Sequence, residues 1–310
     1  MGMARALLLR GSESRFLSQT LPHRPFVRRA VRRFMPGEEL SDALEAARRL
    51  DELDRPSIFT VLGENVESAD ETRAVAAAYS EALNAIQERK LDTDLSVKPT
   101  HLGLDLDPAL ALENLARLAS LAGGMERLVA LDMEASGYVD ATLELYRALR
   151  SSHANVGICL QAYLRRTEED LDGLLASGPM IRLVKGAYNE AESVAFPRKA
   201  EVDANYLRLA RRMLEARRED PGVRVAFGTH DARMISTITR LADELGLPPD
   251  ACEFQMLYGI GRDLQAKLVT SGRAVRVLVS YGSHWFPWYM RRLAERPANV
   301  GFVLRSMVRR

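Results

Sequence analysis

The chain has 310 residues, enough for one large domain or two ordinary ones, and a single α/β barrel fits this length well. Hydrophobic residues make up 47% and charged residues 27%, as in a globular protein with a sizeable core. The 43 basic and 42 acidic residues nearly cancel, so no overall charge favours nucleic acid, and no apolar run reaches the roughly 18 residues of a transmembrane helix.

The N-terminal stretch up to Pro36 is rich in arginine and contains Glu13 as its only acid. Arginines there alternate with apolar residues such as Phe26 and Phe34. Three interpretations stay open: a helix on a membrane surface, part of a targeting segment, or a basic helix docked on the domain. We predict a helical lead-in over residues 1–45 and a single barrel domain over 46–310.

Eight short β-type runs alternate with amphipathic helical stretches along the rest of the chain. The runs cover residues 57–64, 94–100, 127–134, 155–163, 180–188, 223–231, 252–259 and 275–282. Eight βα units within about 230 residues predict an α/β fold of the (βα)8 barrel type. A doubly wound sheet is the alternative, but the segment at 259–264 has only the first two glycines of a dinucleotide-binding fingerprint.

Polar or ionisable residues end the predicted strands, where packing alone would favour Val or Ile. They are Glu64, Lys98, Asp132, Gln161, Arg182, Lys185, Thr229, His230, Gln255 and Tyr281. Because chemistry in such barrels sits at the carboxyl ends of the strands, this ring predicts a functional face there. The scattered histidines predict no metal site, and Cys159 and Cys252 lie in apolar runs that indicate buried thiols in a reducing compartment.

Two adjacent arginines, Arg291 and Arg292, follow the last predicted strand in a short helical segment. One interpretation is a solvated helix with an aromatic underside. The other joins the pair to Lys98, because two guanidinium forks and a point charge suit a small carboxylate. A phosphate is a weaker fit, since only Gly282 is available for a phosphate loop. The residue types alone indicate a carboxylate pocket and define no reaction.

Seven motifs in order, between about residues 35 and 305, carry a family resemblance. They read LSVK, LDME, LQAY, RLVKGAY, FGTHD, EFQMLYGIG and YMRRLAERPAN. The chain resembles the proline dehydrogenases, flavoenzymes that oxidise L-proline to Δ1-pyrroline-5-carboxylate, and is similar to their short monofunctional bacterial members. The resemblance implies a distorted (βα)8 barrel with N-terminal helices and a last helix that lies over the top of the barrel.

The resemblance also implies roles for single residues. Arg182 is similar to the arginine near flavin N5, and Asp132 to the acid that holds Arg182 and Lys98 in place, so these two are the implied catalytic residues. The implied substrate contacts are Lys98, Arg291, Arg292, Tyr188 and Leu257. Glu64 resembles the acid that pairs with Arg291 and closes the pocket. The implied FAD contacts are Met133, Gln161, Arg182, Val184, Lys185, Ala187, Arg198, Lys199, Thr229, His230 and Glu295.

The implied reaction is hydride transfer from C5 of proline to flavin N5, with electrons passed on to a quinone. The implied partners are L-proline, a quinone and a downstream pyrroline-5-carboxylate dehydrogenase, with no nucleic acid. The implied location is cytoplasmic, with peripheral contact on the inner face of the membrane left open. Leu278, Ser280 and Trp288 depart from the family pattern, in which tyrosine, proline and tyrosine are common.

Two rival functions are weighed against this one. The first is an aldolase-like barrel in which Lys185 or Lys98 forms a Schiff base with the substrate. The second is a non-catalytic barrel that binds a small acid or a partner protein. A flavin-coloured protein without a trappable lysine adduct would exclude both.

Overall fold

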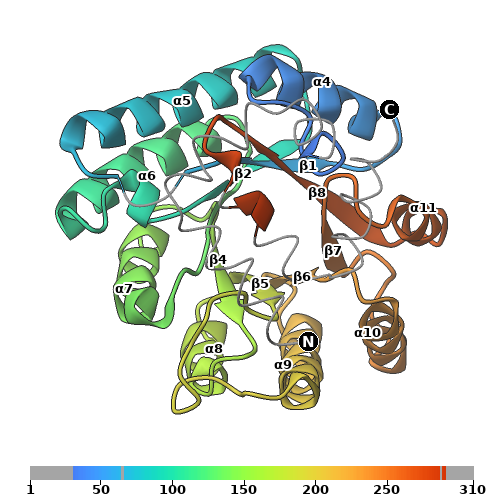
Figure 1. Ribbon diagram of the computed structural model, residues 1–310. Coiled ribbons are helices and arrows are strands. Elements are labelled where there is room, and N and C mark those ends of the chain that lie inside the picture. The colour runs from blue at the N-terminus through green and yellow to red at the C-terminus, as the bar shows by residue number, and fades with distance from the viewer. Residues whose placement is uncertain (1–30, 64–65, 287, 291–310) are drawn as a thin grey trace, which may run out of the picture.

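The computed structural model describes residues 31–63, 66–286 and 288–290, which form a closed barrel of eight parallel strands (Figure 1). Each strand pairs with the next along the chain, and β8 pairs with β1 to close the barrel. The strands are β1 (Ser57–Val61), β2 (Thr93–Val97), β3 (Val129–Leu131), β4 (Val156–Gln161), β5 (Met180–Val184), β6 (Arg224–Gly228), β7 (Cys252–Leu257) and β8 (Ala274–Tyr281). The predicted (βα)8 fold is therefore confirmed.

An outer layer of helices covers the barrel (Figure 1). These are α4 (Leu40–Asp51), α5 (Ala69–Glu88), α6 (Pro108–Gly123), α7 (Val139–Arg150), α8 (Thr167–Leu175), α9 (Lys199–Glu219), α10 (Ala232–Glu244) and α11 (Arg262–Thr270). Short 3-10 turns, η1 (Thr100–Leu102) and η2 (Ser136–Tyr138), follow β2 and β3. Side-chain caps mark where the helices begin: Asp107 Oδ1 accepts from the Ala109 N–H at 2.9 Å, and Asp231 Oδ1 from the Arg233 N–H at 3.1 Å.

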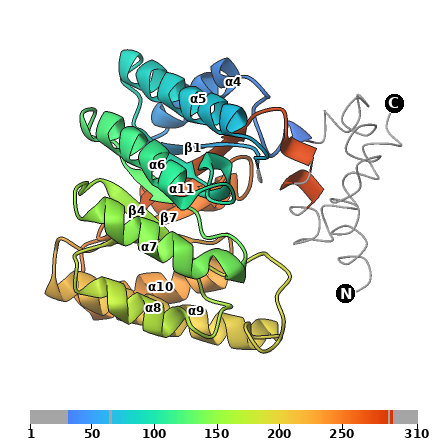
Figure 2. The same cartoon turned by 90° about the vertical axis from the view of Figure 1, so that its left-hand side faces the viewer.

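The barrel is distorted where it closes. Helix α4, which precedes β1, packs against both β1 and β8 and so covers the seam that a helix after β8 would cover in a regular barrel. The chain after β8 instead turns across the carboxyl ends of the strands, as the short red segment in Figures 1 and 2 shows. Helical residues 285–286 and 288–290 begin this crossing, as the prediction of a last helix over the barrel requires.

Strand alternation divides the core into two parts. Side chains that point outward, such as Phe59, Leu95 and Phe254, join the helices in the main apolar core. Inside the barrel, a small apolar cluster coexists with buried charged and amide groups. The apolar cluster is formed by Ile58, Leu128, Ala130, Met180 and Ala226, with Leu278 packed against it.

Several observed strands end a few residues earlier than the β-type runs predicted from the sequence. The run predicted over 180–188 ends as a strand at Val184, and the run over 223–231 at Gly228. The residues beyond these ends form the loops at the carboxyl end of the barrel, where functional side chains of such barrels lie.

Both cysteines are free and buried, as predicted. The predicted boundary at residue 45 falls within α4 and stays a prediction. In the described part of the chain, no helix is long and apolar enough to cross a bilayer.

Candidate active site

A buried arginine lies at the centre of the barrel. Arg182 points inward from β5, and only 5% of its surface is exposed. Its Nη2 donates to Asp132 Oδ1 and to Ser96 Oγ, the latter at 2.9 Å, while Ser96 Oγ donates to the same Asp132 oxygen at 2.8 Å. Burial alone would lower the pKa of Arg182, but the Asp132 carboxylate acts together with other nearby groups, Glu253 among them, to raise the pKa. The site therefore holds a fixed positive charge.

Gln255, on β7, is a further partner of Arg182. Its Oε1 accepts from Arg182 Nη1 at 3.2 Å, so both ends of the guanidinium fork are held. The sequence places Gln255 among the polar strand residues, yet neither composition nor resemblance assigns it a role. The signal that could have identified Gln255 is its position two residues after Glu253, because residues i and i+2 face the same side of a strand.

Lys98 lies at the carboxyl ends of β1 and β2. Its half-buried side chain donates from Nζ to the Gly63 carbonyl oxygen at 3.3 Å. The described start of the last helix packs at the same end of the barrel, where Trp285 Nε1 donates to Glu38 Oε1 at 3.0 Å. Four predicted residues lie outside the described part of the chain. They are Arg291 and Arg292 of the carboxylate clamp, Glu64, which is predicted to pair with Arg291, and Glu295, a predicted FAD contact.

Gln161 is the last residue of β4, and the two polar atoms of its side-chain amide differ in their hydrogen bonding. Its Nε2 donates to the Met133 carbonyl oxygen at 3.0 Å, whereas its buried Oε1 has no hydrogen-bond partner among the described residues. A buried acceptor without a partner costs about 1–3 kcal/mol. This amide oxygen is therefore suited to accept a hydrogen bond from a bound ligand.

Lys185 follows β5 and ties three elements together. Its Nζ donates to Asp203 Oδ1 at 2.6 Å and lies 3.4 Å from Asp231 Oδ2, while Lys199 Nζ donates to the other oxygen of Asp203. Burial would raise the pKa of Asp203, but the hydrogen bonds from Lys185 and Lys199 outweigh it and lower the pKa. Lys185 is thus held by two carboxylates as a structural tether, a poor setting for a Schiff-base amine.

His230 and Leu257 join the ends of β6 and β7. The backbone N–H of Leu257 donates to His230 Nε2 at 2.8 Å, so this nitrogen carries no proton. The resemblance implies that His230 contacts the cofactor and that Leu257 contacts the substrate. Their contact shows that the two residues occupy one part of the barrel rim.

The remaining predicted positions differ in their surroundings. Val184, Ala187 and Tyr188 are half-buried in or just after β5, and Thr229 is buried after β6. Arg198 is exposed at the start of α9, where its Nη2 pairs with Glu201 Oε1 at 2.7 Å. Among the residues that depart from the family pattern, Ser280 and Trp288 are buried and Leu278 is half-buried inside the barrel.

Comparisons with known proteins agree with this arrangement. A family model described as proline dehydrogenase matches residues 43–305. The chain is 37% identical over 281 residues to proline dehydrogenase 2 of Bacillus subtilis subsp. natto, covering 91% of each chain. It is 36% identical over 303 residues to proline dehydrogenase of Deinococcus radiodurans, covering 94% of this chain and 96% of the relative.

A similar solved structure is the crystal structure of proline utilization A from Bdellovibrio bacteriovorus inactivated by N-propargylglycine. The TM-score is 0.81 at 25% identity, and the match covers 94% of this chain and 36% of that one. The family match and the two close relatives extend over most of the chain that forms the barrel. The chain therefore belongs to the proline dehydrogenase family, oxidoreductases that act on a CH–NH group.

Proposed function

We propose that this chain oxidises L-proline to Δ1-pyrroline-5-carboxylate with FAD as its cofactor, by hydride transfer from proline C5 to flavin N5. Proline oxidation is the activity for which the family is named. The observation that carries the cofactor and the mechanism is the buried Arg182, held on both guanidinium ends by Asp132, Ser96 and Gln255. A fixed cation in a low-dielectric interior stabilises a neighbouring group that gains negative charge.

The chain's residues fit a flavin. When bound, FAD supplies the acceptor for the hydride, and the protein supplies orientation and electrostatics. The buried Gln161 Oε1, which has no partner among the described residues, offers an acceptor for an N–H of the ring system. We assign the other cofactor contacts to Met133, Arg182, Val184, Lys185, Ala187, Thr229, His230 and Glu295, with Arg198 and Lys199 on the adenine side.

The substrate is held by a carboxylate clamp in this proposal. Lys98, Arg291 and Arg292 bind the proline carboxylate, because paired guanidinium forks match its geometry. Tyr188 and Leu257 flank the ring. Glu64 pairs with Arg291 and closes the pocket, which orients C5 for transfer.

The reduced cofactor passes its electrons to a quinone, and a pyrroline-5-carboxylate dehydrogenase consumes the product. We place the enzyme in the cytoplasm with peripheral contact to the inner face of the membrane through its basic N-terminal stretch, whose arginines suit anionic lipid.

The test is the visible spectrum of the purified protein before and after anaerobic addition of L-proline. We expect flavin bands that bleach with proline. The double variant Arg291→Met, Arg292→Met should keep the colour and need at least ~100-fold more proline to bleach, since two charge-assisted bonds are lost.

The matched control is Arg48→Met, Arg49→Met, an adjacent exposed pair on α4, which should bleach like the wild type. A colourless protein that also fails to take up added FAD would overturn the proposal. Borohydride trapping of a lysine adduct with substrate would favour the aldolase-like rival instead.

A further inference from the structure

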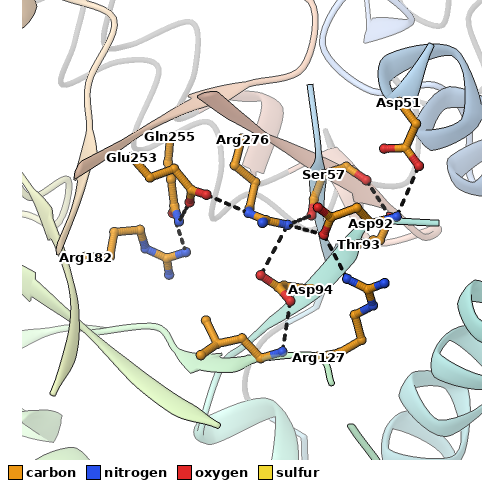
Figure 3. Close-up of polar contacts among 11 residues, drawn as sticks. Asp51, Ser57, Asp92, Thr93, Asp94, Arg127, Arg182, Glu253, Gln255 and Arg276 are labelled. Carbon is orange, nitrogen blue, oxygen red and sulfur yellow. Dashed lines mark hydrogen bonds and ion pairs between the residues drawn. The ribbon is translucent and has the colours of Figure 1, made fainter. Parts of the chain in front are cut away.

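The barrel interior contains a continuous series of polar groups that runs from Arg182 to Asp94 (Figure 3). We call Arg182, Gln255, Glu253, Arg276 and Asp94 the interior column. Gln255 Nε2 donates to Glu253 Oε1 at 2.7 Å, and Arg276 Nε donates to Glu253 Oε2 at 2.9 Å. Arg276 Nη1 then lies 3.2 Å from Asp94 Oδ2. Barrels usually fill this space with branched apolar side chains, so a buried ionic column calls for a reason.

The chemistry of the column gives it a fixed direction. Arginine only donates hydrogen bonds and an ionised carboxylate only accepts them, whereas an amide does both. Gln255 stands between Arg182 and Glu253, so its oxygen must face Arg182 and its NH2 group must face Glu253. If the Gln255 amide were reversed, its NH2 group would face the Arg182 donors and its oxygen would face the Glu253 carboxylate, and neither hydrogen bond could form.

The lower end of the column is anchored independently of the site. Arg276 Nη1 donates to the Ser57 carbonyl oxygen at 3.0 Å, and Asp94 Oδ1 accepts from the Leu128 N–H at 2.8 Å. Glu253 is therefore held from below by a buried arginine that is itself bound to the barrel wall. The orientation of the Gln255 amide follows from that anchor.

Arg182 depends on Gln255 for the second half of its fork. Asp132 and Ser96 hold Nη2, and Gln255 holds Nη1. Two separated contacts define the plane of a guanidinium, whereas contacts at one nitrogen leave it free to rotate about that point. Gln255 is 5% exposed, so water does not readily replace its oxygen.

We propose that Gln255 and Glu253 are positioning residues for proline oxidation: the Gln255 amide fixes the plane of the Arg182 guanidinium, and Glu253 fixes the amide. The inference rests on the proposed function, in which Arg182 stabilises charge at flavin N5. Neither residue touches substrate in this proposal, because both act through Arg182.

The primary test compares Gln255→Met with Asp243→Asn in the FAD-loaded protein. Methionine keeps the length of the side chain and removes the acceptor. Asp243 serves as control because it lies on α10 and pairs with Arg273, away from the interior column. For Gln255→Met we expect the reduction of the bound flavin by proline to slow by roughly 10- to 100-fold, because one hydrogen bond to a charged group is lost. The proline concentration for half-maximal rate should change by less than about 3-fold, since the carboxylate clamp is untouched.

The second readout is the reduction potential of the bound flavin, measured at equilibrium against a reference dye without any substrate. A less well-placed guanidinium stabilises the reduced flavin less, so the potential of Gln255→Met should be more negative than that of the wild type. Asp243→Asn should leave the potential unchanged. A residue that only fills space would not move this quantity.

Two conservative variants separate positioning from packing. Glu253→Gln keeps Gln255 in place but leaves one acceptor oxygen for two donors, Gln255 Nε2 and Arg276 Nε. The Gln255 amide is then less firmly oriented, so reduction should slow by a smaller factor. Gln255→Glu places a second carboxyl beside Glu253, and two such groups share one proton with a raised pKa. The charged and titratable groups around this position are Arg182, Glu253, Arg276, Asp132, Asp94 and Cys159.

Gln255→Glu should therefore show a pH-dependent rescue. Below the raised pKa, the protonated carboxyl donates to Glu253 and accepts from Arg182, as the amide does, and reduction approaches the wild-type rate. As the pH rises through that pKa, a second negative charge appears beside Arg182, and both the rate and the flavin potential should fall relative to the wild type.

The outcomes are distinguishable. If the wild type bleaches with proline but Gln255→Met matches Asp243→Asn in rate and potential, the positioning role is wrong and the proposed function stands. If the wild type holds flavin but proline does not bleach it, the proposed function fails and this inference with it. Should Gln255→Met not fold, an unchanged rate in Glu253→Gln together with a flat pH profile in Gln255→Glu would overturn the inference equally.

Discussion

At the scale of single residues, Arg182 is held in place by geometry that several strands supply. Its partners Ser96, Asp132 and Gln255 come from β2, the end of β3, and β7. A charge that is 5% exposed must be paired and hydrogen-bonded to be tolerated, and each of these contacts contributes. The same contacts restrict its motion, and a charged group that does not need to reorganise is an effective stabiliser of developing charge.

Gly186, between the predicted FAD contacts Lys185 and Ala187, is a second residue with a clear physical requirement. Its φ is +105°, and a Cβ built there would lie 2.1 Å from Tyr163 Cδ1. Only glycine satisfies both conditions. The close approach of the loop to Tyr163 therefore shapes the rim of the site after β5.

We predict that Gly186→Ala lowers the free energy of unfolding by about 2–4 kcal/mol, from backbone strain plus the clash with Tyr163. Gly246→Ala is the matched control, because Gly246 has φ +70° with nothing within 4 Å of a built Cβ, and should cost only about 1 kcal/mol. Urea denaturation of both variants measures the difference. Equal losses of unfolding free energy in the two variants would show that Tyr163 moves aside without a measurable cost.

At the scale of elements, the loops at the carboxyl end are tied to the helices that follow them. Lys185, after β5, is bound by Asp203 in the first turns of α9 and by Asp231, the N-cap of α10. Two consecutive βα units, β5–α9 and β6–α10, thus share one ion-pair cluster. This cluster fixes the rim on the side where we place the cofactor.

The Asp203 carboxylate should make this cluster sensitive to acid. Its pKa is lowered in the folded protein, so its contribution to stability is present above the unfolded value of about 3.9 and is lost as the pH falls through the lower folded value. Asp203→Asn should lower the free energy of unfolding at pH 7 by on the order of 1 kcal/mol, because the ion pair that it breaks is partly buried. The gap to the wild type should stay constant down to about pH 4 and shrink below it.

Urea denaturation from pH 7 to pH 3 measures this gap. Asp250→Asn, at an exposed aspartate after α10, is the control and should stay close to the wild type at every pH. A gap for Asp203→Asn that widens on acidification would contradict the assigned direction of the pKa.

At the scale of the whole molecule, two features distinguish this barrel from a regular one. Helix α4 covers the seam between β8 and β1, which leaves the segment after β8 available to cross the carboxyl ends of the strands. Inside, the interior column runs from Arg182 down to Arg276 and Asp94. The first feature lets the described start of the last helix pack at the carboxyl end of the barrel, and the second holds Arg182 in place from inside the barrel.

The column should be costly to break at its lower end. Arg276→Met leaves Asp94 and Glu253 inside the barrel without their cation, and loss of one partner from a buried ion pair costs about 3–5 kcal/mol. Arg240→Met, in an exposed pair with Glu244 four residues along α10, should cost roughly 0.5 kcal/mol or less. Chemical denaturation of the two variants gives the comparison. A cost for Arg276→Met no larger than that for Arg240→Met would mean that solvent compensates the buried acids.

The sequence by itself determined the number of strands, the βα alternation, the polar residues at the strand ends and the family. These are local properties: hydrophobic periodicity defines elements, and a strand end is visible within a few residues. Glu64, Arg291, Arg292 and Glu295 stay predictions from the sequence, because they lie outside the described residues.

The tertiary structure alone decided which polar residues meet. Arg182 meets Ser96 across 86 positions of sequence and Gln255 across 73, and Leu257 meets His230, which lies just beyond the end of the neighbouring strand β6. Strand alternation tells which side chains point inward, but barrel closure and register decide which of them lie at the same height. The interior column and the cover that α4 gives to the seam were therefore invisible in the sequence, because both depend on contacts between distant elements that form only when the barrel closes.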